Sequence, residues 1–186
     1  VKSTKRLEFF NGVKAELPLL IGVIPFGMIF GVLALDAGIP AGASQAMSAI
    51  IFAGSSQFIT TQLVHVAAPS VVILMTIAVV NLRHALYSAS VSPYTRHLSP
   101  LWKWLLAYLL TDEAYAVTIL HYQQTGAPGQ HDNRHWYFLG AGLALWSSWQ
   151  LSTAAGILLG AVVPESWSLD FTLALTFIAL VVPSLK

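Results

Sequence analysis

Long apolar runs, separated by short polar stretches, make up most of the chain. About 20 helical residues cross the hydrocarbon core of a bilayer, and most of these runs approach that length. The pattern predicts an all-α, polytopic transmembrane helix bundle of about six segments, with room for broken or re-entrant helices. The expected segments are residues 17–35, 44–64, 70–91, 101–120, 136–163 and 171–182, preceded by a basic, amphipathic lead-in over residues 1–14.

The first segment contains Pro25, which removes a helical hydrogen bond and predicts a kink. Gly27 and Gly31 are four residues apart, a spacing that allows another helix to approach closely. Gly156 and Gly160 repeat this spacing in the fifth segment, and the similarity favours an internal repeat. A complete repeat would need a further helix beyond residue 186, so we expect the chain to be incomplete.

The second segment is interrupted near its middle by Gly54, Ser55, Ser56 and Gln57. Small residues and an amide at this depth favour a broken helix that lines a transport site. The alternative is that the serine hydroxyls bond back to carbonyls of their own helix. Gln57 must also find a partner.

The third segment divides into an apolar and a polar face on a helical wheel. Leu82, Ala85, Leu86 and Ala89 share the face suited to lipid or packing. The opposite face carries Asn81, Arg83, His84, Tyr87, Ser88 and Ser90. An arginine at the centre of a membrane helix costs about 2.5–3.5 kcal/mol on insertion scales and usually faces the bundle interior, so this face is the leading candidate for the working site. Ser92 and Pro93 should close the segment.

The fourth segment contains two adjacent acids, Asp112 and Glu113. Asp112 shares a helical face with Tyr108, Thr111, Tyr115 and Thr118. If the third and fourth segments form an antiparallel hairpin, Arg83 and Asp112 reach similar depths at about 1.5 Å per residue. An ion pair between Arg83 and Asp112, or between Arg83 and Glu113, would bury both charges together.

The fifth segment places Trp146, Trp149, Gln150, Thr153 and Ile157 on one face. Tryptophans in the interior of a span differ from the usual interfacial belt. They could wall a substrate pocket or pack against the nearby glycines, and the sequence leaves both interpretations open.

Composition narrows the class of protein. Hydrophobic residues make up 56% of the chain and charged residues 9%, against about 25% in soluble domains. With a mean hydropathy of +0.69, this pattern indicates an integral membrane protein. The absence of cysteine excludes disulfides and thiol chemistry, and a net charge of +1 gives no basic footprint for nucleic acid. His121, His131 and His135 lie in or beside a polar loop and are expected to be solvated, so we predict no metal site. We also predict that the protein has no cofactor and is not an enzyme.

Topology stays open. The basic lead-in favours a cytoplasmic N-terminus, but six spans then place the basic loop of residues 94–103 outside. A re-entrant second segment would reverse that placement.

Four short strings carry a family resemblance, together with LPLLIGVIPFGMIFG at residues 17–31. They are FAGSSQF (52–58), NLRHALY (81–87), LTDEAYA (110–116) and WSSW (146–149). In this order and spacing they resemble the AzlC/YgaZ family, over nearly the whole chain. The resemblance implies a single permease domain over residues 1–186 that lacks the family's C-terminal helices. It further implies a bacterial inner-membrane exporter of branched-chain amino acids, with a small membrane partner of the AzlD/YgaH type. It carries over no assigned binding residue.

An aliphatic zwitterion needs a group for each charge and an apolar pocket. Ser55, Ser56 and backbone amides near Gly54 could hold the carboxylate. Asp112 or Glu113 could meet the ammonium or carry a coupling proton, with His84 as a relay. Arg83 could instead bind the carboxylate directly. The competing hypotheses are a structural subunit without its own substrate site, and an intramembrane hydrolase that uses Ser55 or Ser56 with His84 as base.

Overall fold

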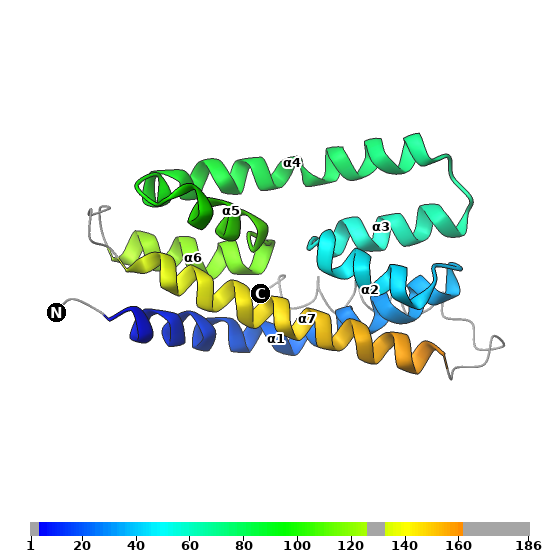
Figure 1. The fold of residues 1–186 in the computed structure, drawn as a ribbon, viewed down its shortest axis with the longest axis horizontal. Helices are drawn as coiled ribbons and strands as arrows, with labels where there is room; N and C mark the ends of the chain where they lie inside the picture. Colours follow the sequence, from blue (N-terminus) through cyan, green and yellow to red (C-terminus); the bar gives the residue numbers. More distant parts are fainter. Residues whose placement is uncertain (1–3, 126–132, 162–186) are drawn as a thin grey trace, which may run out of the picture. The chain divides into compact units, whose positions relative to one another are not determined.

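The computed structural model describes residues 4–125 and 133–161, and these residues form helices and connecting turns without a strand. The all-α prediction is therefore confirmed, while the predicted sixth segment lies outside the described residues. The helices are α1 (Lys5–Asp36), α2 (Ala41–Ile50), α3 (Gly54–His65), α4 (Ser70–Thr95), α5 (Pro100–Tyr108), α6 (Asp112–Gln124) and α7 (Arg134–Gly160), as labelled in Figure 1.

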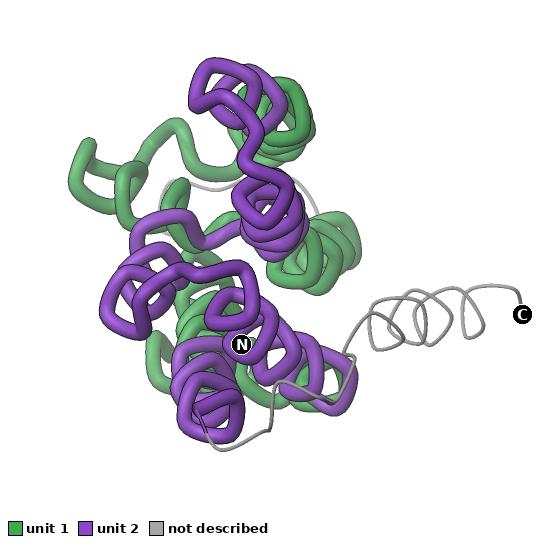
Figure 2. Tube along the Cα trace, turned by 90° about the vertical axis from the view of Figure 1, so that its right-hand side faces the viewer, with its two compact units in different colours: residues 1–20, 78–147 green, residues 21–77, 148–186 purple. Residues whose placement is uncertain are grey.

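The chain divides into two compact units, coloured separately in Figure 2. Unit 1 comprises Val1–Leu20 and Ala78–Ser147, and unit 2 comprises Ile21–Ile77 and Ser148–Lys186. Each of the three long helices, α1, α4 and α7, is divided between the two units. The short helices α2 and α3 belong to unit 2, and α5 and α6 belong to unit 1.

Three predicted segments correspond to single long helices. α1 and α4 are long and apolar enough to cross a membrane. α1 starts at Lys5, so the predicted lead-in is its first part, and the helix continues through Pro25. α4 ends at Thr95, so the prediction that Ser92 and Pro93 close this segment is wrong. A proline in the last turn removes only one helical hydrogen bond, which the end of a helix tolerates.

The second predicted segment is a helical hairpin in unit 2. α2 has 10 residues and α3 has 12, or about 15 and 18 Å, so each is too short to cross a core of about 30 Å. They run in opposite directions on either side of residues 51–53 (Figure 1). The predicted break is confirmed and directly precedes Gly54. The hairpin returns the chain to the end of unit 2 from which it came.

The fourth predicted segment is also two helices, in unit 1. The prediction of one helix over residues 101–120 is wrong, because α5 ends at Tyr108 and α6 begins at Asp112. The hydroxyl of Thr111 accepts a hydrogen bond from the Ala114 amide at 3.4 Å and caps α6. A threonine followed by two acids is a helix-start signal, which explains the break and could have predicted it. The element order is thus a long helix and a hairpin, repeated, and then α7.

Close packing of α1 on α7 occurs in both units. In unit 1, a Cβ on Gly12 would collide with the carbonyl oxygen of Tyr137. In unit 2, a Cβ on Gly31 would lie 2.9 Å from the carbonyl carbon of Gly156, and one on Gly156 would collide with the Met28 carbonyl. The contacts advance along both helices together, so α1 and α7 run in the same direction. The predicted role of Gly27 and Gly31 in close helix approach is confirmed, and Gly156 and Gly160 of α7 are the glycines that face this part of α1.

Candidate functional site

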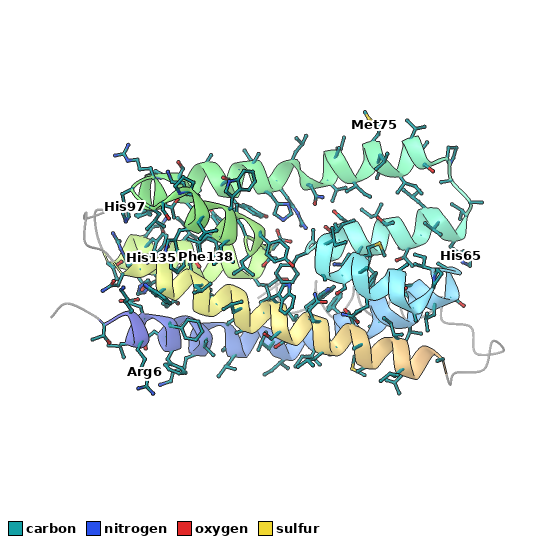
Figure 3. All side chains as sticks on the ribbon, in the orientation of Figure 1. Arg6, His65, Met75, His97, His135 and Phe138 are labelled. Carbon is teal, nitrogen blue, oxygen red and sulfur yellow. The ribbon has the colours of Figure 1, made fainter. Side chains whose placement is uncertain are left out.

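The part of α4 in unit 1 has the two faces that the sequence predicts. Leu82 and Leu86 are exposed, at 64% and 72%, on the side suited to lipid. Met75, earlier on the same helix, also points away from the other helices in Figure 3. Arg83 and Tyr87 are half-buried on the opposite face, whereas Ser88, predicted to join them, is exposed.

The predicted ion pair between α4 and α6 is confirmed. Nη1 of Arg83 lies 2.6 Å from Oδ2 of Asp112. The Tyr87 hydroxyl donates to Oδ1 of Asp112 at 2.7 Å, so both carboxylate oxygens are engaged. The start of α6 at Asp112 positions this carboxylate in the first turn, where the positive end of the helix stabilises it.

The predicted antiparallel arrangement behind this pair is wrong. The Tyr115 hydroxyl donates to Oγ of Ser90 at 3.0 Å, and Tyr94 packs on Tyr122 with ring centroids 4.9 Å apart. Contacts therefore advance along α4 and α6 in the same direction. The reason is α5, which carries the chain back before α6 begins.

Aromatic rings surround the ion pair. Tyr87 and Tyr115 stack with centroids 4.4 Å apart, and His84 meets Tyr87 edge-on at 5.9 Å. His84 also forms a hydrogen bond with the backbone of Asn81. Both predicted residues therefore lie on the face of α4 that carries Arg83 and Tyr87. Glu113 follows Asp112 and accepts a hydrogen bond from the Thr111 side chain.

Two further acids of unit 1, both on α1, were missed as site candidates because they precede the first predicted apolar segment. Oε2 of Glu8 pairs with Nε2 of His121 at 3.1 Å, so the expectation of a solvated His121 is wrong. Glu16 is fully buried. Among the described residues no group of three histidines or acids could hold a metal ion, and His131 lies outside that part of the chain.

In unit 2, Gln57 is fully buried and bridges the hairpin to α7. Its Nε2 donates to the Ile51 carbonyl at 2.6 Å, and its Oε1 accepts from Nε1 of Trp149 at 3.0 Å. The prediction that Gln57 must find a partner is confirmed, and one of its partners lies within the break itself.

A neutral hydrogen-bond network extends from this bridge. Oγ of Ser48 and Oγ1 of Thr153 are 3.1 Å apart. Nε2 of Gln150 donates to the Ser48 carbonyl at 3.1 Å, and Oε1 of Gln150 accepts from Nε2 of Gln45 at 2.8 Å. The sequence interpretation missed the α2 members Gln45 and Ser48, although their spacing along one helical face is a visible signal.

The break in unit 2 joins the polar network to an aromatic cluster. Ala53 precedes α3 in an extended conformation and gives no side-chain cap, and the first turn contains no acid. The Trp149 ring covers Gly54, because a Cβ there would lie 3.1 Å from a ring carbon. Phe30 stacks on Trp149 at 6.4 Å and meets Phe58 edge-on at 6.1 Å. Trp149 thus packs against the start of α3, whereas Gly156 and Gly160, the glycines that the sequence offered as its neighbours, lie against α1.

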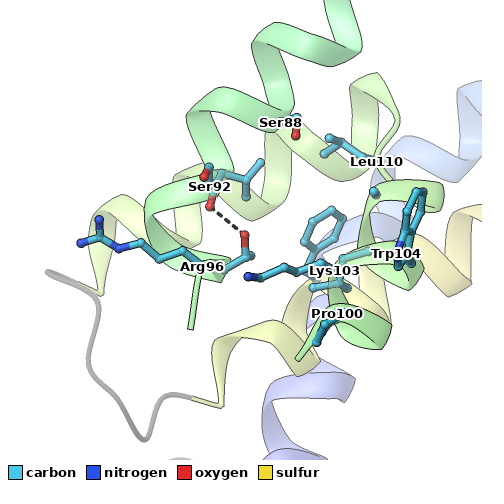
Figure 4. Close-up of a pocket in the computed structure, with 12 residues that line it drawn as sticks. Ser88, Ser92, Arg96, Pro100, Lys103, Trp104 and Leu110 are labelled. Carbon is cyan, nitrogen blue, oxygen red and sulfur yellow. Dashed lines mark hydrogen bonds between the residues drawn. The ribbon is translucent and has the colours of Figure 1, made fainter. Parts of the chain in front are cut away.

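The remaining tryptophan candidate belongs to unit 1, where Nε1 of Trp146 donates to the Tyr108 hydroxyl at 2.7 Å. Unit 1 also contains an open pocket of about 370 Å³ between the end of α4 and α5 (Figure 4). Its polar lining includes Arg96 and Lys103, and its apolar lining includes Trp104 and Leu110. Of the residues on the predicted polar face, only Ser88 lines it, and Arg83, His84, Asp112 and Glu113 do not.

Comparison with known proteins gives one consistent result. The AzlC protein family matches residues 18–163. The inner membrane protein YgaZ of Escherichia coli (strain K12) is 29% identical over 187 residues, covering 96% of this chain and 74% of the relative. An uncharacterized membrane protein of Archaeoglobus fulgidus is 29% identical over 98% of the chain and 78% of its own length. One from Helicobacter pylori (strain 26695) is 27% identical over 96% and 78%. No solved structure matches.

Proposed function

The chain belongs to the AzlC family of membrane proteins, and from this premise we propose that it is the permease subunit of a branched-chain amino acid exporter. It is a multi-pass protein of the inner membrane. The proposed transport is secondary and proton-coupled, without a cofactor. The proposed second component is a small hydrophobic membrane protein of the AzlD/YgaH type, as the family resemblance implies.

The observation that carries the proposal is the tip of the hairpin α2–α3. An antiparallel hairpin of two helices presents the carbonyl end of α2 and the amide end of α3 at the same place. These ends are equivalent to about −0.5 and +0.5 elementary charge. A free amino acid carries one positive and one negative group on the same carbon, so the tip is complementary to it.

Each end of the tip has residues suited to its role. At the start of α3, Ser55 and Ser56 supply hydroxyls beside the first backbone amides for a carboxylate, and no acid of that turn competes. At the end of α2, backbone carbonyls can accept hydrogen bonds from an ammonium. The Ile51 carbonyl, just after this helix, already accepts one from the side-chain amide of Gln57. Asp112 is less suited to the ammonium, because Arg83 and Tyr87 occupy both of its oxygens.

The aromatic cluster supports the choice of an aliphatic side chain. Trp149 lies against Gly54, Phe30 stacks on Trp149 and Phe58 packs on Phe30, so an amino acid held at the tip would place its side chain near aromatic rings. In such a pocket one methylene is worth about 1–3 kcal/mol. This difference favours valine, leucine and isoleucine over alanine.

The test is efflux of labelled valine from preloaded cells, with and without the protein and its small partner, at two external pH values. We expect faster, pH-sensitive efflux that requires both chains. The double variant Ser55→Ala/Ser56→Ala should slow it by about tenfold, which corresponds to about 1.4 kcal/mol. Ser44→Ala is the matched control, because that buried hydroxyl bonds the Ile39 and Pro40 carbonyls of its own helix start.

Unchanged efflux under every condition would contradict the proposal. It would favour the structural-subunit hypothesis, in which the polar networks serve only for packing with a partner. The hydrolase hypothesis would instead require an ester or peptide product that disappears in the Ser55→Ala/Ser56→Ala variant.

A further inference from the structure

Glu16 of α1 has no partner for its charge in the part of the chain that the structure describes. Its side chain is 0% exposed, and it lies about 16 Å along the helix from Lys5. Among the described residues, neither Oε1 nor Oε2 has a hydrogen-bond partner, and no salt bridge involves this residue. An isolated carboxylate in such a place is very unfavourable, so the side chain keeps a proton or shares one.

The register of α1 against α6 identifies the residue that lies at the level of Glu16. The two helices run in opposite directions within unit 1 (Figure 1), and the pair of Glu8 with His121 fixes one level of contact. Eight residues along α1 lead from Glu8 to Glu16. Eight residues back along α6 lead from His121 to Glu113. Both steps cover about 12 Å, so Glu16 and Glu113 lie at one level, and Glu113 acts electrostatically on Glu16.

The charges around this pair leave both acids without a cation of their own. Asp112 neutralises Arg83, whose field also reaches Glu113, and Glu8 holds His121. From α7, the titratable group that faces Glu16 is the hydroxyl of Tyr137. On α4, the charges that act electrostatically on His84 are those of Arg83 and Asp112. Two carboxylates so placed cannot both ionise at low cost, so one of them retains a proton.

We propose that Glu16 and Glu113 form a proton-binding pair, and that loading and release of its proton couples export to the proton gradient. The coupling role rests on the proposed function, whereas proton binding itself does not. One proton taken from the water on one side of the membrane converts one carboxylate to a carboxylic acid. The same proton is released to the water on the other side, which restores the carboxylate. Glu113 lies in the first turn of α6, so the charge of the pair acts on the tip of the hairpin α5–α6.

The coupling test uses the full chain with its small partner in proteoliposomes. With 1:1 coupling, a difference of one pH unit should support an about tenfold valine gradient. Glu16→Gln should abolish that gradient and retain valine counterflow at equal pH, which shows that the variant is folded. Glu16→Asp should restore part of the pH response. Asp36→Asn is the matched control, since Asp36 is an exposed acid at the end of the same helix.

A pH-driven gradient that survives in Glu16→Gln would overturn the coupling role. So would a valine gradient driven by sodium at constant pH, because the pair would then take a metal cation. If the wild type moves no valine at all, the proposed function fails and the coupling role fails with it.

Proton binding is tested separately, by pH-difference infrared spectroscopy of the purified complex. The carbonyl band of a buried carboxylic acid should titrate in the wild type and in Asp36→Asn, and should be lost in Glu16→Gln. A band unchanged by Glu16→Gln would overturn the pair irrespective of transport.

Discussion

The helices α3 and α6 are the second members of two hairpins of similar length, and their first turns differ in chemistry. α3 starts with Gly54, Ser55 and Ser56, has no acid in its first turn and receives no side-chain cap. α6 starts with Asp112 and Glu113 and is capped by Thr111. The positive end of α6 therefore has its own carboxylates, while that of α3 can receive the carboxylate of a ligand.

The surrounding networks differ in the same way. Around α2 and α3, the described hydrogen bonds to α7 join amides, hydroxyls and an indole, all uncharged. Around α6, an arginine, an aspartate, three glutamates and a histidine gather. A neutral network suits repeated binding of a zwitterion, whereas a charged one suits proton exchange. The comparison teaches that one hairpin architecture can present either an uncapped helix start without acids or a capped one with two carboxylates when the residues of a single turn change.

Removal of Arg83 is the largest test of the charged hairpin. Arg83→Ala leaves Asp112 without its cation and should reduce the free energy of unfolding by about 2–3 kcal/mol. A fully buried pair loses about 3–5 kcal/mol, and the smaller figure applies because the Asp112 side chain is 38% exposed. Chemical denaturation of the purified protein in detergent measures it.

The double variant Arg83→Ala/Asp112→Ala serves as the control for that experiment. It should be more stable than Arg83→Ala alone, because no unpaired charge remains. A double variant no more stable than the single one would show that the ion pair does not explain the loss.

The second test makes the start of α3 resemble that of α6. Ser55→Asp places a carboxylate in the first turn, which should stabilise the helix by about 0.3–1 kcal/mol. The same charge should repel the carboxylate of the substrate and reduce valine efflux by about tenfold. The neutral variant Ser55→Asn is the control of equal size. Equal efflux from both variants would place the substrate carboxylate elsewhere.

The smallest test concerns the cap. Thr111→Ala removes the hydroxyl that accepts the Ala114 amide and should reduce the free energy of unfolding by about 1 kcal/mol. The reciprocal change, Ala53→Ser, should supply a cap to α3 and raise stability by at most a similar amount. Thermal denaturation in detergent compares the two variants, and opposite signs are expected. A shift of the same sign in both would mean that capping does not distinguish the hairpins.

Sequence reasoning was most successful where the energetic cost of burial left a residue few possible environments. Arg83 in an apolar helix required an acid, and the nearest strong candidate at a similar depth was Asp112. The pair was found although the assumed antiparallel hairpin does not exist, because charge neutralisation restricts the partner more than topology does. The break at Gly54 was likewise visible, since glycine and serines together weaken a membrane helix.

The missed features depend on contacts between distant parts of the chain. Glu16 looks like one more polar residue between the basic lead-in and the first apolar segment, and only the level of contact fixed by Glu8 and His121 reveals its position. The break before Asp112 had a local signal in Thr111, which the apolar run on either side outweighed. Gln45 and Ser48 are recognised as network members only through their hydrogen bonds to α7, about a hundred residues later in the chain.

The packing of α1 on α7 has a consequence for biogenesis. Gly12 lies against Tyr137, so the first helix reaches the bilayer well over a hundred residues before its neighbour is translated. At about 5–20 residues per second, this interval lasts roughly 6–25 s. During that time its glycine stripe and Glu16 must be sheltered by the insertion machinery or by α6, which is made first. The order of synthesis therefore makes α7 the last of the described helices to reach the membrane, and only its arrival covers the glycines of α1.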